Sequence, residues 1–260
     1  MSILFQVLAS GSKGNAVLVC SSKTRVLVDA GLSGTELVRR LEQAGHSARR
    51  LDALIVTHEH QDHVRGVGVL SRRFNLPVYC TCGTLENLPM QIGKLAHTQL
   101  FQTGHPYRIG DLLIHPFAVS HDARDPAGMT IENDDCRLGM CTDLGVVTQL
   151  VRQRLQGCRG LLLEANHDPE LLMNGPYPWH LKQRIRGRHG HLSNTDTHEL
   201  LRELFHAGLR AVVLAHLSEI NNRPELVLEA LADLRQRAEW EGIHFHIGKQ
   251  HEIGCALELT

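Results

Sequence analysis

The chain has 260 residues, of which 42% are hydrophobic, enough to build one large domain or two small ones around a real core. Its formal net charge is −1, so bulk attraction to nucleic acid or membrane is not expected, although a local basic patch remains open. Seven cysteines without disulfide-like spacing, a start without a basic leader and the lack of any long apolar run predict a cytoplasmic protein that does not enter a membrane.

The predicted elements alternate between strands and helices along the chain. In the first third, turn signals separate strands over Ile3–Ala9, Asn15–Cys20, Arg25–Asp29, Leu51–Val56 and Pro77–Cys80, with helices over Thr35–Ala44, capped by Ser33, and over Val64–Phe74. The middle adds strands over Leu112–Val119, Met129–Glu132, Arg137–Thr142 and Leu161–Glu164. The last part predicts a helix over Ser193–Ala207, a strand over Ala211–Ala215, the longest helix over Arg223–Trp240, and strands over Ile243–Ile247 and Gly254–Leu259. This α/β order predicts two sheets covered by helices in four layers, and no linker divides residues 1–260 into separate domains.

One short segment, Thr57–His63, concentrates metal-binding side chains directly after an apolar run. It reads T-H-E-H-Q-D-H and contains His58, His60, Asp62 and His63. Imidazole and carboxylate together suit zinc, manganese or iron. Four such side chains are more than one tetrahedral ion needs once other parts of the chain contribute. The segment therefore indicates a two-metal site, and such sites usually perform hydrolysis.

Three further candidate ligands each follow the end of a predicted strand. His121 comes after Phe117–Ser120, Asp143 after Met140–Thr142, and His216 after Val212–Ala215. Side chains at several strand ends can converge on one rim of a sheet, as the segment around His58 also does. The sequence therefore predicts that the three join that segment in one centre.

The motifs T-H-E-H-Q-D-H, V-S-H, C-T-D-L-G and L-A-H, in this order, resemble those of the metallo-β-lactamase-fold hydrolases. The resemblance implies an α/β fold with a four-layer αββα sandwich and two divalent ions. It implies that the first ion is bound by His58, His60 and His121, the second by Asp62, His63 and His216, and that Asp143 bridges both. β-Lactamases of this fold place a cysteine at the second ion, which the chain lacks there, so the phosphodiesterase and glyoxalase II branches fit better.

Two segments outside the metal motifs bear on the substrate. The glycine-rich turn A-S-G-S-K-G-N, at positions 9–15, is either a rim loop that touches phosphate or a plain hairpin turn. The segment from Tyr177 and Trp179 to Arg188 carries four cations at alternating positions. These residues suit phosphate binding and base stacking on a single strand, or equally a solvated helix face with two core aromatics.

These segments, together with E-A-N-H-D, G-H-L-S-N and L-S-E-I-N-N, resemble the bacterial YycJ/WalJ family. The resemblance implies a metal-dependent DNA exonuclease that works from the 5′ end and uses two Zn²⁺ or Mn²⁺ ions. In related RNase Z enzymes the histidine matching His191 assists departure of the leaving group, and His189 is a nearby competitor for that role. We expect Asp62 and Asp143 to orient the attacking water, and Glu59 either to hold a ligand imidazole or to lie on the surface. The expected substrate contacts are Ser12, Lys13, Asn15, His167, Arg186, Ser193 and Asn194.

Two other functions remain open from the residues alone. One is a small-molecule hydrolase acting on a cyclic phosphodiester or a thioester, which the near-neutral pI keeps in play. The other is a non-catalytic metal protein that acts through partners, and the complete ligand set counts against it. The basic segment around Arg184–Arg188 favours the nuclease, with DNA as the expected partner. The oligomeric state is not predicted.

Overall fold

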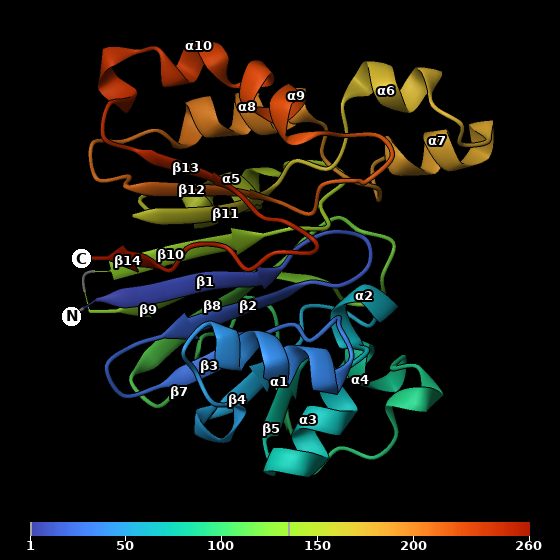
Figure 1. Cartoon of the computed structure of the whole chain (residues 1–260), viewed down its shortest axis with the longest axis vertical. Coiled ribbons are helices and arrows are strands. Elements are labelled where there is room, and N and C mark those ends of the chain that lie inside the picture. Colours follow the sequence, from blue (N-terminus) through green and yellow to red (C-terminus); the bar gives the residue numbers. More distant parts are fainter. Residues whose placement is uncertain (1, 135) are drawn as a thin grey trace.

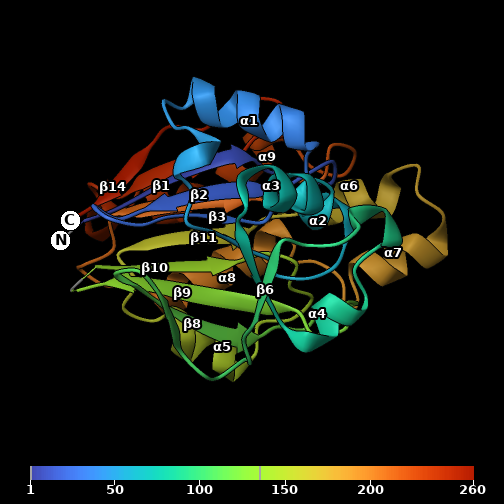
Figure 2. The ribbon, with the colours of Figure 1, turned by 90° about the horizontal axis from the view of Figure 1, so that it is seen from below.

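Two sheets lie face to face in the centre of the molecule, and helices cover their outer faces (Figure 1, Figure 2). The structure, a computed structural model, describes residues 2–134 and 136–260. Seen from below, α1 and α3 lie over one sheet and α5 under the other. The predicted four-layer αββα sandwich is therefore confirmed.

The first sheet is built from the N-terminal half of the chain plus the last strand. Its order is β14-β1-β2-β3-β4-β5-β6, antiparallel from β14 to β3 and parallel from β3 to β6. The strands are β1 (Ile3–Ala9), β2 (Ala16–Cys20), β3 (Arg25–Val28), β4 (Ala53–Ile55), β5 (Pro77–Cys80), β6 (His97–Leu100) and β14 (Leu257–Leu259). Strands β1 and β14 bring the two ends of the chain together.

The second sheet has the order β13-β12-β11-β10-β9-β8-β7 and is parallel from β10 to β13. Its strands are β7 (Tyr107–Ile109), β8 (Leu112–Ala118), β9 (Ala127–Asn133), β10 (Cys136–Cys141), β11 (Gly160–Glu164), β12 (Ala211–Ala215) and β13 (His244–Ile247). Because β10, β11 and β12 run in the same direction, their carboxyl ends meet at one edge, which is where the candidate ligands are expected.

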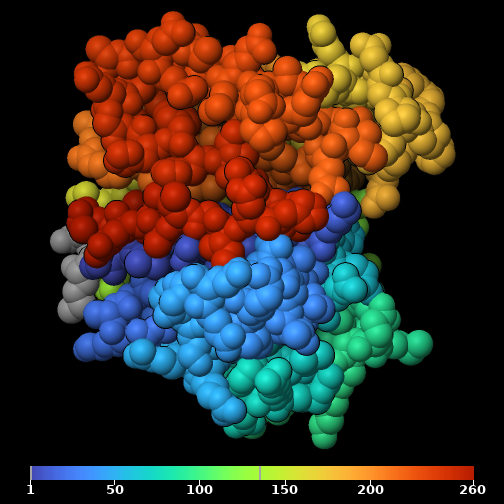
Figure 3. Space-filling view, in the orientation of Figure 1, coloured from blue at the N-terminus to red at the C-terminus, as the bar shows by residue number. Residues whose placement is uncertain are grey.

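The helices pack on the outer faces or project from them. They are α1 (Gly34–Gln43), α2 (Gln61–Val64), α3 (Val67–Phe74), α4 (Cys82–Glu86), α5 (Gln149–Leu155), α6 (Pro169–Asn174), α7 (Trp179–Ile185), α8 (Asn194–Leu204), α9 (Pro224–Ala230) and α10 (Ala232–Arg235), with 3₁₀ turns at Ala48–Arg50, Met90–Ile92 and Ala238–Trp240. The pair α6 and α7 forms a projecting corner (yellow in Figure 3). Within the described residues, none of these helices has the length and apolarity needed to cross a membrane.

Three apolar layers hold the sandwich together. Phe5 and Val19 of the first sheet face Ile114 and Ile131 of the second, and all four side chains are fully buried. A second cluster fixes α1 and α3 on the first sheet, and a third fixes α5 and α8 on the second. Strands β2, β11 and β12 are buried along their whole length, as expected for strands covered on both faces.

Two predicted helices are wrong in extent. The helix predicted over Val64–Phe74 is confirmed from Val67 as α3, and it starts later than predicted because Val64 ends α2 and the N–H of Gly66 donates to the carbonyl of Ala30. The helix predicted over Arg223–Trp240 consists of three elements, α9, α10 and the 3₁₀ turn Ala238–Trp240. α9 and α10 are separated at Leu231, whose ψ of 7° departs from helical geometry. After the break, Trp240 is buried and packs near Phe205. The hydrophobic periodicity of the sequence does not reveal this tertiary contact.

Candidate metal centre

The predicted ligands converge at one edge of the two sheets. Asp143 follows β10, Glu164 ends β11 and His216 follows β12, and the register pairs Glu164 with Ala215. His58 follows β4 on the other sheet. The short helix α2 begins soon after His58. Its residues Asp62 and His63 therefore face His216 and Asp143 of the second sheet.

Three residues at this edge have left-handed backbone conformations. Asp29 has φ 60°, Asp143 φ 57° and His216 φ 57°. This region is uncommon for residues other than glycine, and such strain concentrates at functional sites. Here it turns the chain sharply at the end of each strand while leaving the side chain at the rim.

The side chains gather into groups that could each hold a metal ion. Within every group the ligand atoms lie within 4.8 Å of one another. The groups are His58, His60 and His121; Asp62, His63 and His216; His58, His63 and Asp143; and Asp143, Glu164, His191 and His216. The first two groups correspond to the two ligand sets expected from the sequence. Such clusters fit a dinuclear site.

Asp143 lies between the two sets. Its Oδ1 is 3.7 Å from Nε2 of His121 in the first set and 3.5 Å from Nδ1 of His216 in the second. Its Oδ2 is 3.3 Å from Nε2 of His63, without hydrogen-bond geometry. This position fits a carboxylate that reaches two ions.

Unpartnered buried atoms show that the centre fits metal ions. Nε2 of His58 and Oδ2 of Asp143 are buried with no hydrogen-bond partner among the described residues. Buried polar atoms are nearly always hydrogen-bonded, and exceptions call for a missing partner. A divalent cation held by imidazole and carboxylate would supply that partner.

The pKa shifts reflect the crowding of imidazoles and carboxylates. Burial lowers the pKa of His58 well below its usual value. Burial also acts on His63 and His216, but the carboxylate of Asp143, with those of its neighbours, outweighs it and raises both pKa values well above the usual one. Metal ligands must be unprotonated, so an ion held by these two imidazoles would displace their protons.

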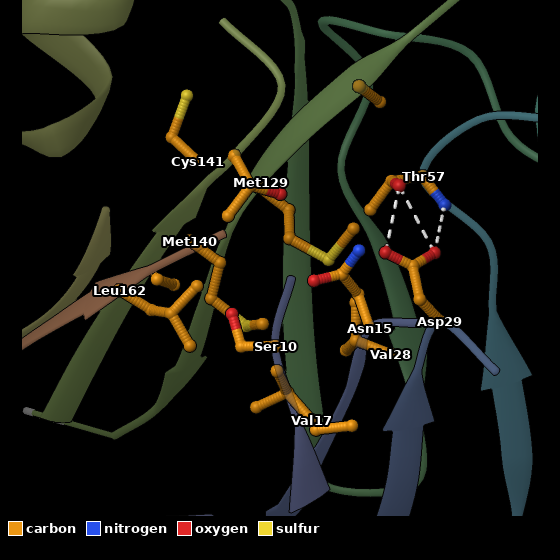
Figure 4. A pocket seen from close by; sticks show the side chains of 14 residues that line it. Ser10, Asn15, Val17, Val28, Asp29, Thr57, Met129, Met140, Cys141 and Leu162 are labelled. Carbon is orange, nitrogen blue, oxygen red and sulfur yellow. Dashed lines mark hydrogen bonds between the residues drawn. The ribbon is translucent and has the colours of Figure 1, made fainter. Parts of the chain in front are cut away.

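A buried carboxylate supports the second set from behind. Oδ2 of Asp29 lies 2.8 Å from Nδ1 of His63, and its Oδ1 accepts the backbone N–H of Thr57 at 2.9 Å. Figure 4 shows Asp29 and Thr57 at the wall of a cavity between the sheets, together with Val17, Met129 and other side chains. The cavity, of about 30 Å³, has room for little more than a water molecule and is no substrate site.

Glu164 is a functional candidate that our predicted site residues omitted. It is fully buried, and its Oε1 lies 2.8 Å from Nδ1 of His191 and 2.9 Å from Nδ1 of His216. Its Oε2 accepts the backbone N–H groups of Leu144 and Leu192. The carboxylate thus holds both imidazoles in a fixed orientation. The available signal was a charged residue at the end of an otherwise apolar strand.

The rim loop near Gly11 lies beside the centre. Asn15 is buried, and its Nδ2 is 3.3 Å from Oδ2 of Asp62 and 3.1 Å from Nε2 of His63, so it faces candidate ligands. Ser12 and Lys13 are exposed. The ammonium of Lys13 forms an ion pair with Glu219 at 2.5 Å.

The other predicted substrate contacts divide into two groups. His167, Arg186 and Ser193 line a cleft of about 240 Å³ next to His191. Burial lowers the pKa of His167 to about 4, so its imidazole is neutral at pH 7. Asn194 does not line the cleft. Its amide pairs reciprocally with that of Asn222, at 3.0 and 2.9 Å.

The structure bears on two of the open alternatives. Oε1 of Glu59 accepts the backbone N–H of Arg124 at 2.7 Å, and its Oε2 is buried with no hydrogen-bond partner among the described residues, so neither oxygen bonds an imidazole there. Trp179 is not a core residue, because it is 56% exposed at the start of α7. Arg184, on the same helix, donates to Asp122, whose Oδ1 lies 3.3 Å from Nε2 of His121. Helix α7 is therefore tied to the edge of the metal centre.

Comparison with known sequences agrees with this geometry. Residues 24–217 match the family described as the beta-lactamase superfamily domain. The chain is 36% identical over 255 residues to "Exodeoxyribonuclease YycJ" of Bacillus anthracis, covering 97% of this chain and 95% of that one. It is 38% identical over 249 residues to "Exodeoxyribonuclease WalJ" of Streptococcus pneumoniae, covering 94% and 92%. The chain belongs to the metallo-β-lactamase superfamily and, within it, to the YycJ/WalJ family. It is a metal-dependent hydrolase with a His/Asp metal site.

Solved structures support the fold. The metallo-β-lactamase fold protein YhfI from Bacillus subtilis superposes with a TM-score of 0.75 at 18% identity, covering 99% of both chains. The Zn²⁺-bound PqqB from Methylobacterium extorquens gives a TM-score of 0.70 at 17% identity, covering 99% of both chains. At this identity the likeness establishes the metallo-β-lactamase fold of this chain and nothing about its substrate.

Proposed function

We propose that this hydrolase is an exodeoxyribonuclease that degrades DNA from the 5′ end with two bound Zn²⁺ or Mn²⁺ ions. The end-to-end similarity to relatives named exodeoxyribonucleases carries the proposal. The exposed Trp179 and the cations of α7, next to the metal centre, provide a surface for bases and phosphates. The first set, His58, His60 and His121, would hold one ion, the second set, Asp62, His63 and His216, the other, and Asp143 would contact both.

The residues around the centre have separate tasks. Bound divalent ions of this kind activate water and neutralise charge on phosphate oxygens. Asp62 and Asp143 would hold the ions and so orient the attacking water. Glu164 engages Nδ1 of His191, so Nε2 is the nitrogen left to give a proton to the departing oxygen. Asp29 and Asn15 hold the second set in place.

The test is digestion of DNA labelled separately at the 5′ and the 3′ end, with RNA and a cyclic nucleotide as alternative substrates and Zn²⁺ or Mn²⁺ added. We expect the 5′ label to be released first, and Asp62→Ala to abolish the digestion. Asp233→Asn, which alters an exposed carboxylate on α10, is the matched control and should keep full activity. Digestion that persists in Asp62→Ala, or a preference for RNA or the cyclic nucleotide, contradicts the proposal.

A further inference from the structure

The cleft beside His191 has the composition of a nucleotide site. It is lined along α6, at the start of α8 and by the segment after α7. Figure 1 shows α6 and α7 at the projecting corner of the molecule. One wall is apolar and consists of Pro169, Leu172 and Met173 of α6. The volume of about 240 Å³ is below that of most ligand pockets and suits one nucleotide rather than a run of them.

His167 indicates that the cleft is built for a ligand. It is 3% exposed, and its Nδ1 has no hydrogen-bond partner among the described residues. Its backbone is fixed, because its carbonyl accepts the N–H of Asn194 at the start of α8. A buried imidazole that is rigidly placed at a cleft wall and lacks a partner is expected to bond a ligand or an ordered water.

The charges in the cleft decide which part of a nucleotide lies where. The exposed Asp196 carboxylate on the cleft wall repels phosphate, so the part of the cleft beside it suits the base and sugar. Its Oδ2 already accepts the N–H and the hydroxyl of Ser193, which leaves Oδ1 to accept from a base N–H group. Arg186 is exposed at the cleft and its Nη1 lies 3.5 Å from Sδ of Met173, so its cation is available for the phosphate.

The cleft is continuous with the reacting centre, because His191 lines both. A group seated in the cleft is therefore attached to the oxygen that His191 protonates, which is the leaving oxygen. In degradation from the 5′ end, the leaving oxygen is the 3′ oxygen of the terminal nucleotide. The location thus assigns the cleft to the nucleotide that is released.

We infer that the cleft binds the 5′-terminal nucleotide of the DNA, with its base against Pro169 and Met173 and its 5′-phosphate at Arg186. In the cleavage step the water oxygen bonds to phosphorus, the bond from phosphorus to the 3′ oxygen breaks, and that oxygen takes a proton from His191, which a water proton restores. The product is a deoxynucleoside 5′-monophosphate, and the remaining strand carries a new 5′-phosphate for the next cycle. This inference rests on the proposed function.

The experiment measures inhibition of DNA digestion by dAMP, by deoxyadenosine and by inorganic phosphate. Wild type should be inhibited by dAMP more strongly than by either of the other two. Arg186→Ala should raise the inhibition constant of dAMP at least tenfold, and Met173→Ala should raise it several-fold without changing that of inorganic phosphate. Arg235→Ala removes an exposed cation on α10, remote from the cleft, and should leave all three constants unchanged.

Both variants alter exposed side chains, so the test does not depend on a disrupted core. Equal dAMP inhibition constants in wild type, Arg186→Ala and Met173→Ala overturn the inference even when DNA digestion is normal. Calorimetric titration with dAMP measures binding without DNA digestion, so it tests the nucleotide site separately from the proposed function. If no DNA is digested but dAMP binding still depends on Arg186 and Met173, the nucleotide site stands and the nuclease proposal fails.

Discussion

Oδ2 of Asp29 lies 2.8 Å from Nδ1 of His63, and both residues are buried beneath the metal centre. The contact fixes the imidazole ring, so that its Nε2 points to the carboxylates of Asp62 and Asp143. Oδ1 of Asp29 is held in turn by the N–H of Thr57, the residue that precedes the metal motif. Carboxylates behind ligand histidines set ring orientation and raise ligand basicity.

We predict that Asp29→Asn lowers metal affinity about 10–100-fold. Asparagine keeps the volume and tolerates the left-handed backbone, so the change removes the charge with little backbone strain. Competition with a chromogenic chelator measures the affinity without relying on activity. Asp52→Asn is the control. Asp52 lies at the other end of the sheet, and its carboxylate accepts the N–H of Arg25. Equal affinities in wild type and Asp29→Asn would show that the carboxylate has no role in metal binding.

His191→Ala should lower kcat on DNA by about 10²–10⁴-fold, the range for loss of a general acid. The ester bis(p-nitrophenyl) phosphate should be much less affected, because its leaving group departs without a proton. Steady-state kinetics measures the loss in kcat on each substrate, so the two losses can be compared. The metal content of His191→Ala should remain that of wild type.

The neighbouring histidine provides a matched control for that variant. His189 is exposed, and we expect His189→Ala to behave as wild type on both substrates. An equal loss on DNA and on the p-nitrophenyl ester in His191→Ala would mean that the residue acts through the metal centre and not as a proton donor.

The position of most residues of the candidate centre could be predicted, because they follow strands whose sequences are clearly apolar. His121, Asp143 and His216 each follow such a strand, and the parallel order of β10, β11 and β12 brings strand ends together. Their assignment as ligands stays a prediction. Asp29 could not be singled out, since an aspartate after a strand is also an ordinary turn residue. Its left-handed φ and its contact with His63 exist only in the folded chain.

Other parts of the fold were missed because tertiary contacts override local pattern. The short strands β6 and β7 and the helices α5 and α6 are too brief to show a period, and the helix α7 was only one of two alternatives for its segment. Helix α7 buries none of its residues, so it has no apolar stripe to detect. Asn194 was expected to touch substrate, but its side chain is committed to Asn222, a pairing 28 positions away in the sequence that no local motif reveals.

Gly31→Ala should disrupt the second set of ligands. A Cβ at Gly31 would lie 1.7 Å from the carbonyl oxygen of Asp62 and 2.6 Å from the backbone nitrogen of Asn15, so α2 must shift. We expect a loss of about 1–3 kcal/mol in the free energy of unfolding, as for overpacked sites. Elemental analysis should find less metal per chain than in wild type.

Gly254→Ala is the control for this substitution, because its Cβ would meet its nearest neighbour at an ordinary 3.4 Å. Denaturant unfolding of both variants compares the stabilities. Wild-type stability and metal content in Gly31→Ala would contradict the close approach between the strand end after β3 and α2.

A buried guanidinium, that of Arg40, joins α1 to the rim loops. Nη1 of Arg40 donates to the carbonyls of Leu8 and Gln250, and its Nε donates to Oε1 of Glu36. Glu36→Gln removes the partner charge and should destabilise the protein at pH 7. The hydrogen bond from Arg39, together with Arg40, lowers the pKa of Glu36 from its ordinary 4.5 to about 2.

Because the folded-state pKa is the lower one, this contribution to stability is complete above about pH 4.5 and is lost as the pH falls towards 2. The difference in free energy of unfolding between wild type and Glu36→Gln should therefore be constant from pH 7 to 5 and shrink below pH 4.5. Urea unfolding at closely spaced pH values measures it, with Glu42→Gln, an exposed glutamate on the same helix, as the control. A difference that does not change with pH would mean that the carboxylate of Glu36 stabilises the protein through packing and not through its charge.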